Sequence, residues 1–169
     1  MRFNTCLAAL AVTFVAATPA VAQQASATAN ARGVVLSPLT LTKVSDLDFG
    51  TVAASAAAGN VTVDANSGFR TVSGGVTAVP STPTRGEFTG LAQAATTVQL
   101  TLVPPTGNVL VSGTNSVAVN SMSFDSAGTT RVVPAGGSFT VGVGGDFGIA
   151  ANQPNGTYTA LFQVTADYQ

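Results

Sequence analysis

Apolar and polar residues alternate along most of this chain, and Gly, Pro or Asn interrupts the alternation roughly every ten residues. A period of two places successive side chains on opposite faces, which is typical of strands buried on one face. No window repeats apolar residues at helical spacing, and the most helix-like run, VAASAAA at 52–58, is expected to be a loop or one short turn. The pattern predicts an all-β fold, an Ig-like antiparallel β-sandwich.

The runs between the turn signals give the expected strands, which lie at 34–42, 46–52, 61–64, 69–73, 86–91, 96–103, 109–113, 117–124, 131–133, 138–150 and 156–169. Pro38 interrupts the first run. Because proline cannot donate to a ladder, this strand is expected at a sheet edge or at a switch between sheets. ANSG at 65–68 is expected to join a hairpin, and PPTGN at 104–108 is expected to form a turn.

The stretch GTYTALFQVTADYQ at 156–169 has the clearest strand pattern in the chain. An Ig-like sandwich normally ends with two paired strands. No residues follow this one, so the sandwich is expected to lack its last strand. The odd positions are mostly polar, and the even positions are expected to line an acceptor groove: Gly156, Tyr158, Ala160, Phe162, Val164, Ala166 and Tyr168.

Residues 23–33, QQASATANARG, also alternate, with polar even positions and small odd ones, namely Ala25, Ala27, Ala29, Ala31 and Gly33. Burying four alanine methyl groups contributes about 3 kcal/mol, whereas ordering ten residues costs about 10 to 20 kcal/mol. The segment therefore needs an existing sheet edge whose unpaired N–H and C=O groups it can satisfy. We expect a donor strand, and the alternative is a disordered tail of biased composition.

Residues 1–22 have the features of a secretory signal peptide. Arg2 is followed by an apolar run at 7–17 that is too short to span a bilayer, and Ala-Val-Ala at 20–22 is a typical cleavage site. The only cysteine, Cys6, lies in this segment, so the exported chain is expected to fold without a disulfide.

The remainder is expected to consist of the extension at 23–33 and one domain at 34–169. It contains no second apolar segment long enough to span a membrane, so no membrane insertion is expected after cleavage.

Composition argues against most catalytic and binding chemistry. Charged residues are only 8% of the chain, and a net charge of −1 provides no basic surface for nucleic acid. Histidine is absent, and no thiol remains after residue 22, which removes the commonest general base and the usual zinc ligands. We expect no enzymatic activity, no catalytic residue, no cofactor and no metal site. An enzyme built on carboxylates, lysine or tyrosine is the third hypothesis.

Several local motifs are interpreted as structural. Asp46 and Asp48 are too few for a calcium loop and are expected to serve a turn. GVGGDFG at 142–148 lacks the Lys-Ser/Thr ending of a phosphate loop and is expected to be a bulged or closely packed strand. The sequon at 155–157 is expected to mark a turn. Four arginines are expected on the solvated surface: Arg32, Arg70, Arg85 and Arg131.

The end of the chain resembles the subunits of chaperone–usher pili, which share a Gly fourteen places from the C-terminus and a penultimate Tyr. Gly156 and Tyr168 occupy these two places. EFTGL, TTVQLTL and the terminal stretch also resemble the spore-coat-protein-U-like fimbrillins. SPLTLTKVSDLDFGTV and NGTYTALFQVTADYQ resemble an uncharacterised family of small secreted proteins of Gram-negative bacteria, described only as a domain of unknown function.

The pilin resemblance implies an exported structural subunit of a surface fimbria. In the periplasm an Ig-like chaperone would lend the missing strand, and at an outer-membrane usher the extension of another copy would replace it. The partners would be copies of itself in a head-to-tail polymer on the cell surface. The alternative is a self-complemented secreted sandwich that acts as a surface coat or a carbohydrate-binding protein.

Overall fold

The computed structural model describes residues 24–169, so the expected signal peptide lies outside the described residues. The described chain divides into two units, residues 24–34 and residues 35–169. Residues 24–34 contain no helix or strand, and every one of them is exposed. All the described strands lie in the second unit.

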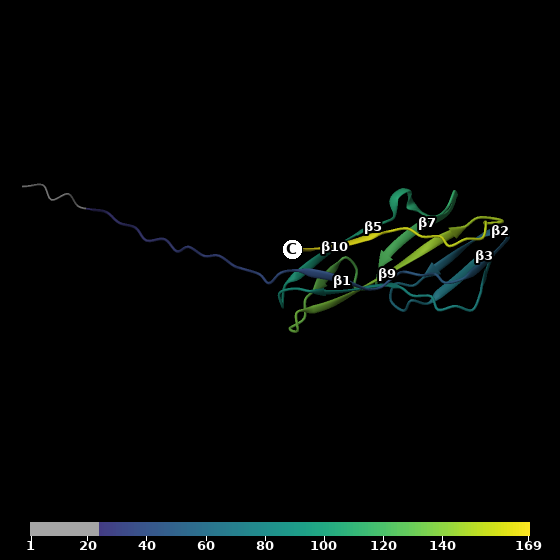
Figure 1. The fold of residues 1–169 in the computed structure, drawn as a ribbon. Coiled ribbons are helices and arrows are strands. Elements are labelled where there is room, and N and C mark those ends of the chain that lie inside the picture. The colour runs from purple at the N-terminus through teal and green to yellow at the C-terminus, as the bar shows by residue number, and fades with distance from the viewer. Residues whose placement is uncertain (1–23) are drawn as a thin grey trace, which may run out of the picture. The chain divides into compact units, whose positions relative to one another are not determined.

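The second unit is an antiparallel all-β sandwich, and this prediction is confirmed. Its only helical element among the described residues is a 3-10 turn at Thr106–Asn108, where PPTGN was expected to turn. No helix in this part of the chain is long and apolar enough to cross a bilayer. Figure 1 shows the strands, which are β1 (Thr40–Ser45), β2 (Val52–Val63), β3 (Arg70–Ala78), β4 (Gly86–Leu91), β5 (Thr97–Val103), β6 (Val109–Ser112), β7 (Asn115–Phe124), β8 (Thr130–Val132), β9 (Ser138–Ile149) and β10 (Gln163–Tyr168).

The strands form two sheets. The larger sheet has the order β1-β4-β9-β2-β3, and β7 lies on the other edge of β9 and pairs in turn with β6. The smaller sheet has the order β10-β5-β8. β9 is the central strand of the larger sheet: its first half pairs with β4, and its second half pairs with both β2 and β7.

Apolar side chains from the facing sides of the two sheets form the core. Val98 and Leu100 of β5 and Val141 and Val143 of β9 are almost completely buried. A second cluster lies further along β9 and contains Val61, Val76, Val117, Val119, Phe147 and Ile149. Each buried valine, leucine or phenylalanine contributes about 1.5 to 3 kcal/mol. The described domain is therefore stabilised by strand pairing and a valine-rich core.

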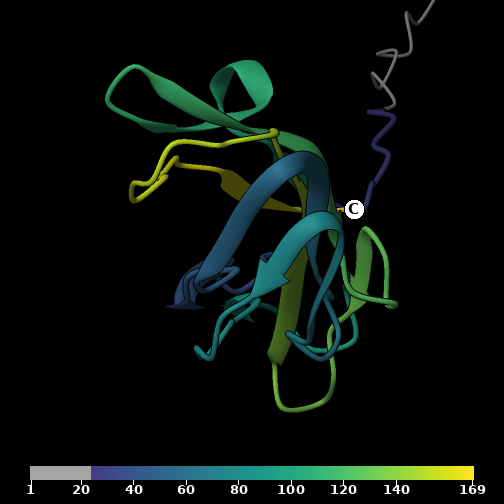
Figure 2. The ribbon, with the colours of Figure 1, turned by 90° about the vertical axis from the view of Figure 1, so that its right-hand side faces the viewer.

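The prediction of a loop or short turn at 52–58 was wrong, because this alanine run is the first part of β2. β3 supplies its hydrogen-bonding partner, and the register shifts between Ala54 and Gly59. The two strands approach so closely there that a Cβ at Gly75 would collide with the carbonyl of Ala57. Figure 2 shows the bend of these strands in blue and teal. Backbone pairing thus overrides the low strand propensity of alanine.

Other strand boundaries also differ from the predictions; the strand expected at 69–73, for example, extends to Ala78 in β3. The first strand begins at Thr40, two residues after Pro38, because proline has no N–H for the ladder. The run at 46–52 makes only one isolated bridge, Asp48 to Thr84, before β2 starts. The Asp48 carboxylate instead accepts a hydrogen bond of 2.7 Å from the N–H of Gly50 and closes a turn. The strand expected at 156–169 is limited to Gln163–Tyr168.

The hairpin around residues 65–68 is confirmed as the connection of β2 to β3. Asp64 organises its turn: one carboxylate oxygen accepts from the Ser67 hydroxyl at 2.7 Å and from the Ser67 N–H at 2.8 Å. These hydrogen bonds lower the pKa of Asp64 from its ordinary value of 3.8, and the one from the Ser67 hydroxyl has the largest effect.

The glycine-rich run at 142–148 is the middle of β9, so its interpretation as a closely packed strand is confirmed. A Cβ at Gly142 would collide with the carbonyl of Ala65, and one at Gly144 would collide with the carbonyl of Val63. The missing side chains let the backbone at the end of β2 lie directly against β9. Only glycine permits this approach.

Candidate functional site

β10 has a free edge. Its only partner strand among residues 24–169 is β5. In the same register, the N–H of Gln169 donates to the carbonyl of Thr97 at 3.0 Å. Hydrogen-bonded positions alternate in an antiparallel pair, so the odd-numbered residues of β10 direct their main-chain groups to β5. The even-numbered residues direct theirs away from β5, and these are Val164, Ala166 and Tyr168.

β1 has a free edge as well, since it pairs with β4 and with no other described strand. It runs antiparallel to β10. The Tyr168 hydroxyl at the end of β10 donates to the carbonyl of Ser37 just before β1, at 2.8 Å. At the other end, the Phe162 ring lies 3.1 Å from the position a Cβ would occupy on Gly86, beside the end of β1.

We call the junction between these two edges the β1/β10 seam; Cα atoms of β1 and β10 come within 8 Å of each other at its narrowest part. The apolar side chains that line it pack on the core formed by Val98, Leu100, Val141 and Val143, yet none of them is fully buried. No described strand pairs with these two edges from between them, and the side chains stay partly exposed. The half-buried residues of the seam are Leu39, Leu41, Phe162, Val164, Ala166 and Tyr168.

Tyr168 ties the β1/β10 seam together at one end. Besides donating to Ser37, its hydroxyl accepts a hydrogen bond from the N–H of Gln93 at 2.7 Å. The ring is half-buried against the core. The penultimate tyrosine therefore connects β10 to the segment before β1 and to the loop after β4.

The remaining predicted positions of the terminal stretch precede β10 and lie outside regular strand. Thr159 forms an isolated bridge to Val111 through two 3.0 Å hydrogen bonds. The Tyr158 hydroxyl donates to the carbonyl of Pro154 at 2.6 Å. A Cβ on Gly156 would lie 2.5 Å from the Ser112 hydroxyl. Gly156, Tyr158 and Ala160 thus do not share the edge formed by β10.

The donor residues predicted in the extension are Ala25, Ala27, Ala29, Ala31 and Gly33. All of them lie in the exposed, strand-free stretch at 24–34, and no neighbouring atom lies within 4 Å of the position a Cβ would occupy on Gly33. The structure brings together the predicted residues of β10, and it leaves the alanines of the extension free of any strand.

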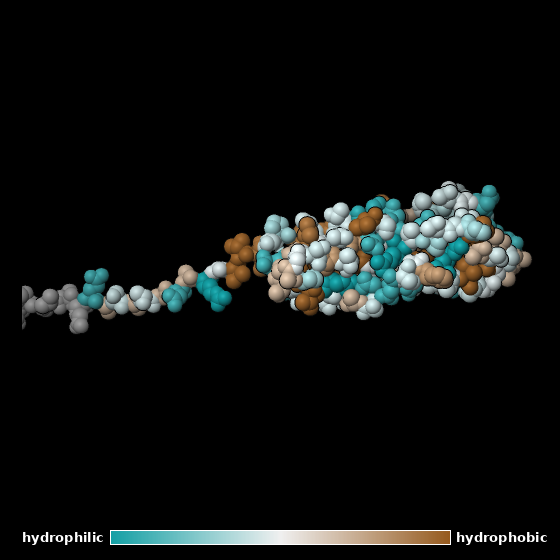
Figure 3. All heavy atoms as spheres, turned by 90° about the horizontal axis from the view of Figure 1, so that it is seen from below, coloured by the Kyte–Doolittle hydropathy of each residue, from teal (hydrophilic) through white to brown (hydrophobic). Residues whose placement is uncertain are grey.

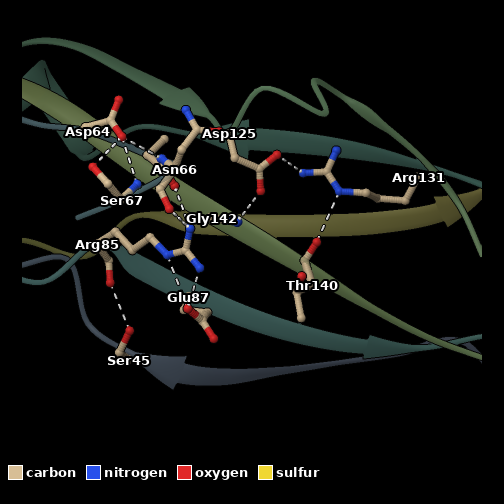
Figure 4. A network of polar contacts seen from close by, with 11 residues as sticks. Ser45, Asp64, Asn66, Ser67, Arg85, Glu87, Asp125, Arg131, Thr140 and Gly142 are labelled. Atoms are coloured by element: carbon tan, nitrogen blue, oxygen red, sulfur yellow. Dashed lines mark hydrogen bonds and ion pairs between the residues drawn. The ribbon is translucent and has the colours of Figure 1, made fainter. Parts of the chain in front are cut away.

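A gap, the β8/β9 seam, separates β8 from the first half of β9 (residues 138–142), and polar side chains fill it. Arg131 of β8 is only 7% exposed. It donates from Nε to the carbonyl of Thr140 at 3.1 Å and forms a 2.7 Å ion pair with Asp125. The other carboxylate oxygen of Asp125 accepts from the N–H of Gly142 at 2.7 Å (Figure 4).

The prediction that the arginines are solvated surface residues was wrong for three of the four. Arg131 is buried, and the other two are half-buried. Arg85 forms a 2.7 Å ion pair with Glu87 and donates to the carbonyls of Ala65 and Asn66 (Figure 4). Arg70 donates to main-chain carbonyls of two loops, those of Phe49, Thr51 and Val79. The sequence alone does not reveal these contacts, because many of the partners are backbone carbonyls of other segments.

The acidic residues form no metal centre among the described residues, where no three His, Cys, Asp or Glu side chains cluster. Asp46 forms a 2.6 Å ion pair with Lys43 on the surface. Asp146 accepts from the Thr62 hydroxyl at 2.6 Å and from the Asn120 amide at 2.5 Å. These carboxylates are engaged in local hydrogen bonds.

Hydrophilic and apolar residues are mixed on one face of the domain. Figure 3 shows pale residues over most of the face seen from below, with separate brown apolar patches.

Residues 39–168 match the protein family described as Domain of unknown function (DUF4402). No curated protein and no solved structure matches the chain. The β1/β10 seam combines unpaired main-chain groups of β10 with half-buried apolar side chains.

Proposed function

The chain belongs to the DUF4402 family, and we propose that it is an exported structural subunit of a surface fimbria. In this proposal copies are joined by donor-strand exchange, and a periplasmic Ig-like chaperone and an outer-membrane usher mediate the assembly. The observation that carries the proposal is the β1/β10 seam, in which two unpaired strand edges flank half-buried apolar side chains. A strand added there would complete a sheet and cover the core at once.

The main-chain groups of β10 define what can bind. Val164, Ala166 and Tyr168 each offer one N–H and one C=O to an incoming strand. Such hydrogen bonds depend on extended backbone rather than on side-chain identity, and side chains that alternate into the seam set the register. An extended polypeptide with apolar residues at every second position is the matching ligand.

The extension has this pattern. Its alanines recur at every second position from Ala25 to Ala31, and the residues between them are polar. The side chains of the β1/β10 seam already pack on the core, so only shallow space remains above them. Alanine suits such space, whereas a bulky donor residue would have to displace the residues beneath it. This supports residues 25–33 of a second copy as the donor.

The direction of the donor follows from the directions of β1 and β10. The acceptor's own extension is continuous with the segment before β1, next to Tyr168. In a head-to-tail polymer the next subunit must therefore connect at the Phe162 end. Its donor strand would run antiparallel to β10 and parallel to β1. Repetition of such a contact generates an open filament.

A truncated chain that lacks residues 23–33 tests the proposal. We expect it to be monomeric and less stable than the chain from Gln23 onward, which should form polymers. The peptide QQASATANARG at one hundred times its Kd should raise the Tm of the truncated chain by about 5 to 10 °C. Differential scanning calorimetry and light scattering provide the two measurements.

The matched control peptide carries Ala27→Asp and Ala29→Asp, which would place unpaired carboxylates against the core. It should leave the Tm unchanged. If the truncated chain is a monomer that melts cooperatively at the same temperature with and without QQASATANARG, the proposed function is incorrect.

A further inference from the structure

The first half of β9 is another strand edge of this sandwich, since β4 pairs with only one side of it. Gly137 accepts a hydrogen bond from the N–H of Ala92 on the β4 side. In that register the odd-numbered residues of β9 bond to β4, and the even-numbered ones face the β8/β9 seam. The backbone of Ser138, Thr140 and Gly142 would therefore be available to an extended segment.

Two charged residues occupy that position. The N–H of Asp125 donates to the carbonyl of Gly142 at 2.9 Å, and its carboxylate accepts from the N–H of Gly142 at 2.7 Å. Arg131 donates to the carbonyl of Thr140 at 3.1 Å (Figure 4). The Gly142 carbonyl is thus paired with the main chain that continues β7, whereas side chains bond the N–H of Gly142 and the carbonyl of Thr140. A surface hollow of about 450 Å³ lies over them.

The ion pair is firmly held. The Arg131 and Asp125 side chains are only 7% and 16% exposed, and their closest N and O atoms are 2.7 Å apart. Arg131 also donates to the carbonyl of Gly128 at 2.6 Å. Moving this ion pair away from the β9 edge would leave two charges unpaired where little water reaches them, which is strongly unfavourable.

The β1/β10 seam has no such ion pair. Its half-buried residues are all uncharged, and Lys43 of β1 pairs with Asp46 at the surface. Inward-pointing charges are one of the means by which proteins protect strand edges from unwanted pairing. The molecule therefore protects one of these edges and leaves the other without protection.

We propose that Arg131 and Asp125 close the β9 edge to strand addition and so favour the β1/β10 seam over it. This inference rests on the proposed function for its biological meaning. It concerns different residues, however, and predicts a gain of binding when they are replaced.

The test uses the double variant Arg131→Met with Asp125→Asn, which removes both charges together and keeps an amide oxygen near Gly142. Isothermal titration with QQASATANARG into the variant that lacks residues 23–33 should give two sites per chain, against one in the parent. Sedimentation velocity should also show self-association of the variant through its opened β9 edge.

Two further variants make the result specific. Arg70→Met removes an arginine that also bonds backbone carbonyls but lies away from β9, and it should leave the stoichiometry at one. Thr140→Pro, added to the double variant, should abolish the second site. The N–H of Thr140 faces the β8/β9 seam, so its loss leaves the β4 ladder intact.

The outcomes separate the two proposals. One peptide per chain in both the parent and the double variant, without self-association, overturns the role of Arg131 and Asp125 and leaves the proposed function standing. If the parent binds no peptide and the double variant binds one, only the proposed function is overturned. If the double variant fails to fold, Arg131→Lys replaces it, because one ammonium cannot span Thr140 and Asp125. A folded Arg131→Lys protein with no second site also overturns the inference.

Discussion

Individual polar residues in this protein hold backbone in place. Arg70 joins two loops through main-chain carbonyls, and Arg131 substitutes for a strand at the edge of β9. Asp48 and Asp64 each accept backbone N–H groups in turns. With charged residues forming only 8% of the chain, most of them have a structural partner inside the fold.

Asp64 gives a pH-dependent prediction at this scale. Its pKa is lowered in the folded state, so its ionised form adds stability above the unfolded pKa, and that stability is lost as the pH falls through the folded pKa. Asp64→Asn should lower the Tm by about 1 to 3 °C at pH 7. The difference should vanish below the folded pKa.

Thermal melts of both proteins between pH 2 and pH 7 provide the measurement. Asn keeps a side-chain oxygen for the turn, so it isolates the effect of the charge. A Tm difference that is constant across this range would show that the charge of Asp64 plays no part.

At the scale of elements, β10 combines two functions that its alternating residues separate. The odd-numbered residues bond to β5, and the even-numbered ones carry both the core-facing side chains and the free main-chain groups. Proline therefore has opposite effects at neighbouring positions. It removes an internal hydrogen bond at an odd position and an external one at an even position.

Ala166→Pro should leave the truncated chain folded, with a Tm close to that of the parent, and should abolish stabilisation by the peptide QQASATANARG. Thr165→Pro is the matched control, because its N–H bonds within the sheet, and it should cost about 1 to 3 kcal/mol of unfolding free energy. Chemical denaturation with and without peptide measures both effects. Peptide stabilisation that survives in Ala166→Pro would place the binding site elsewhere.

Local pattern predicted the elements well in β4, β5 and β9, whereas the alternation at 156–169 forms a strand only over Gln163–Tyr168. It failed at 52–58, because alanine has a low propensity for strands and the local pattern does not show the pairing with β3 that forms this strand. It also missed the Arg131–Asp125 pair, whose members serve backbone groups of β9. The apolar face of β10 could be predicted, whereas the placement of β1 beside it required the topology.

At the scale of the whole molecule, the positions of two charged residues distinguish a head-to-tail polymer from a chain whose extension pairs with its own domain. Arg32 is the only charged residue at 24–34, Asp167 is the only one on β10, and neither has an ion-pair partner among the described residues. An extension that folded back on its own β1 would run parallel to β10 and would bring these two charges together. The donor of a head-to-tail polymer would run the other way.

Asp167→Arg therefore separates the two hypotheses. If the proposed polymer forms, the variant should assemble as the parent does, and light scattering should give the same mass distribution. If the chain closes on itself, the parent should be monomeric, Asp167→Arg should open it, and Arg32→Asp in addition should restore the monomer. Size-exclusion chromatography with light scattering compares the three proteins.

The ion pairs and the low surface charge also bear on how the protein responds to salt. Short internal pairs such as Arg131–Asp125 are shielded from mobile ions, and an exterior with few unmatched charges has little long-range field for salt to screen. Contacts made through backbone hydrogen bonds and small apolar groups share this property. A fibre of such units would hold together equally well in fresh water and in brine.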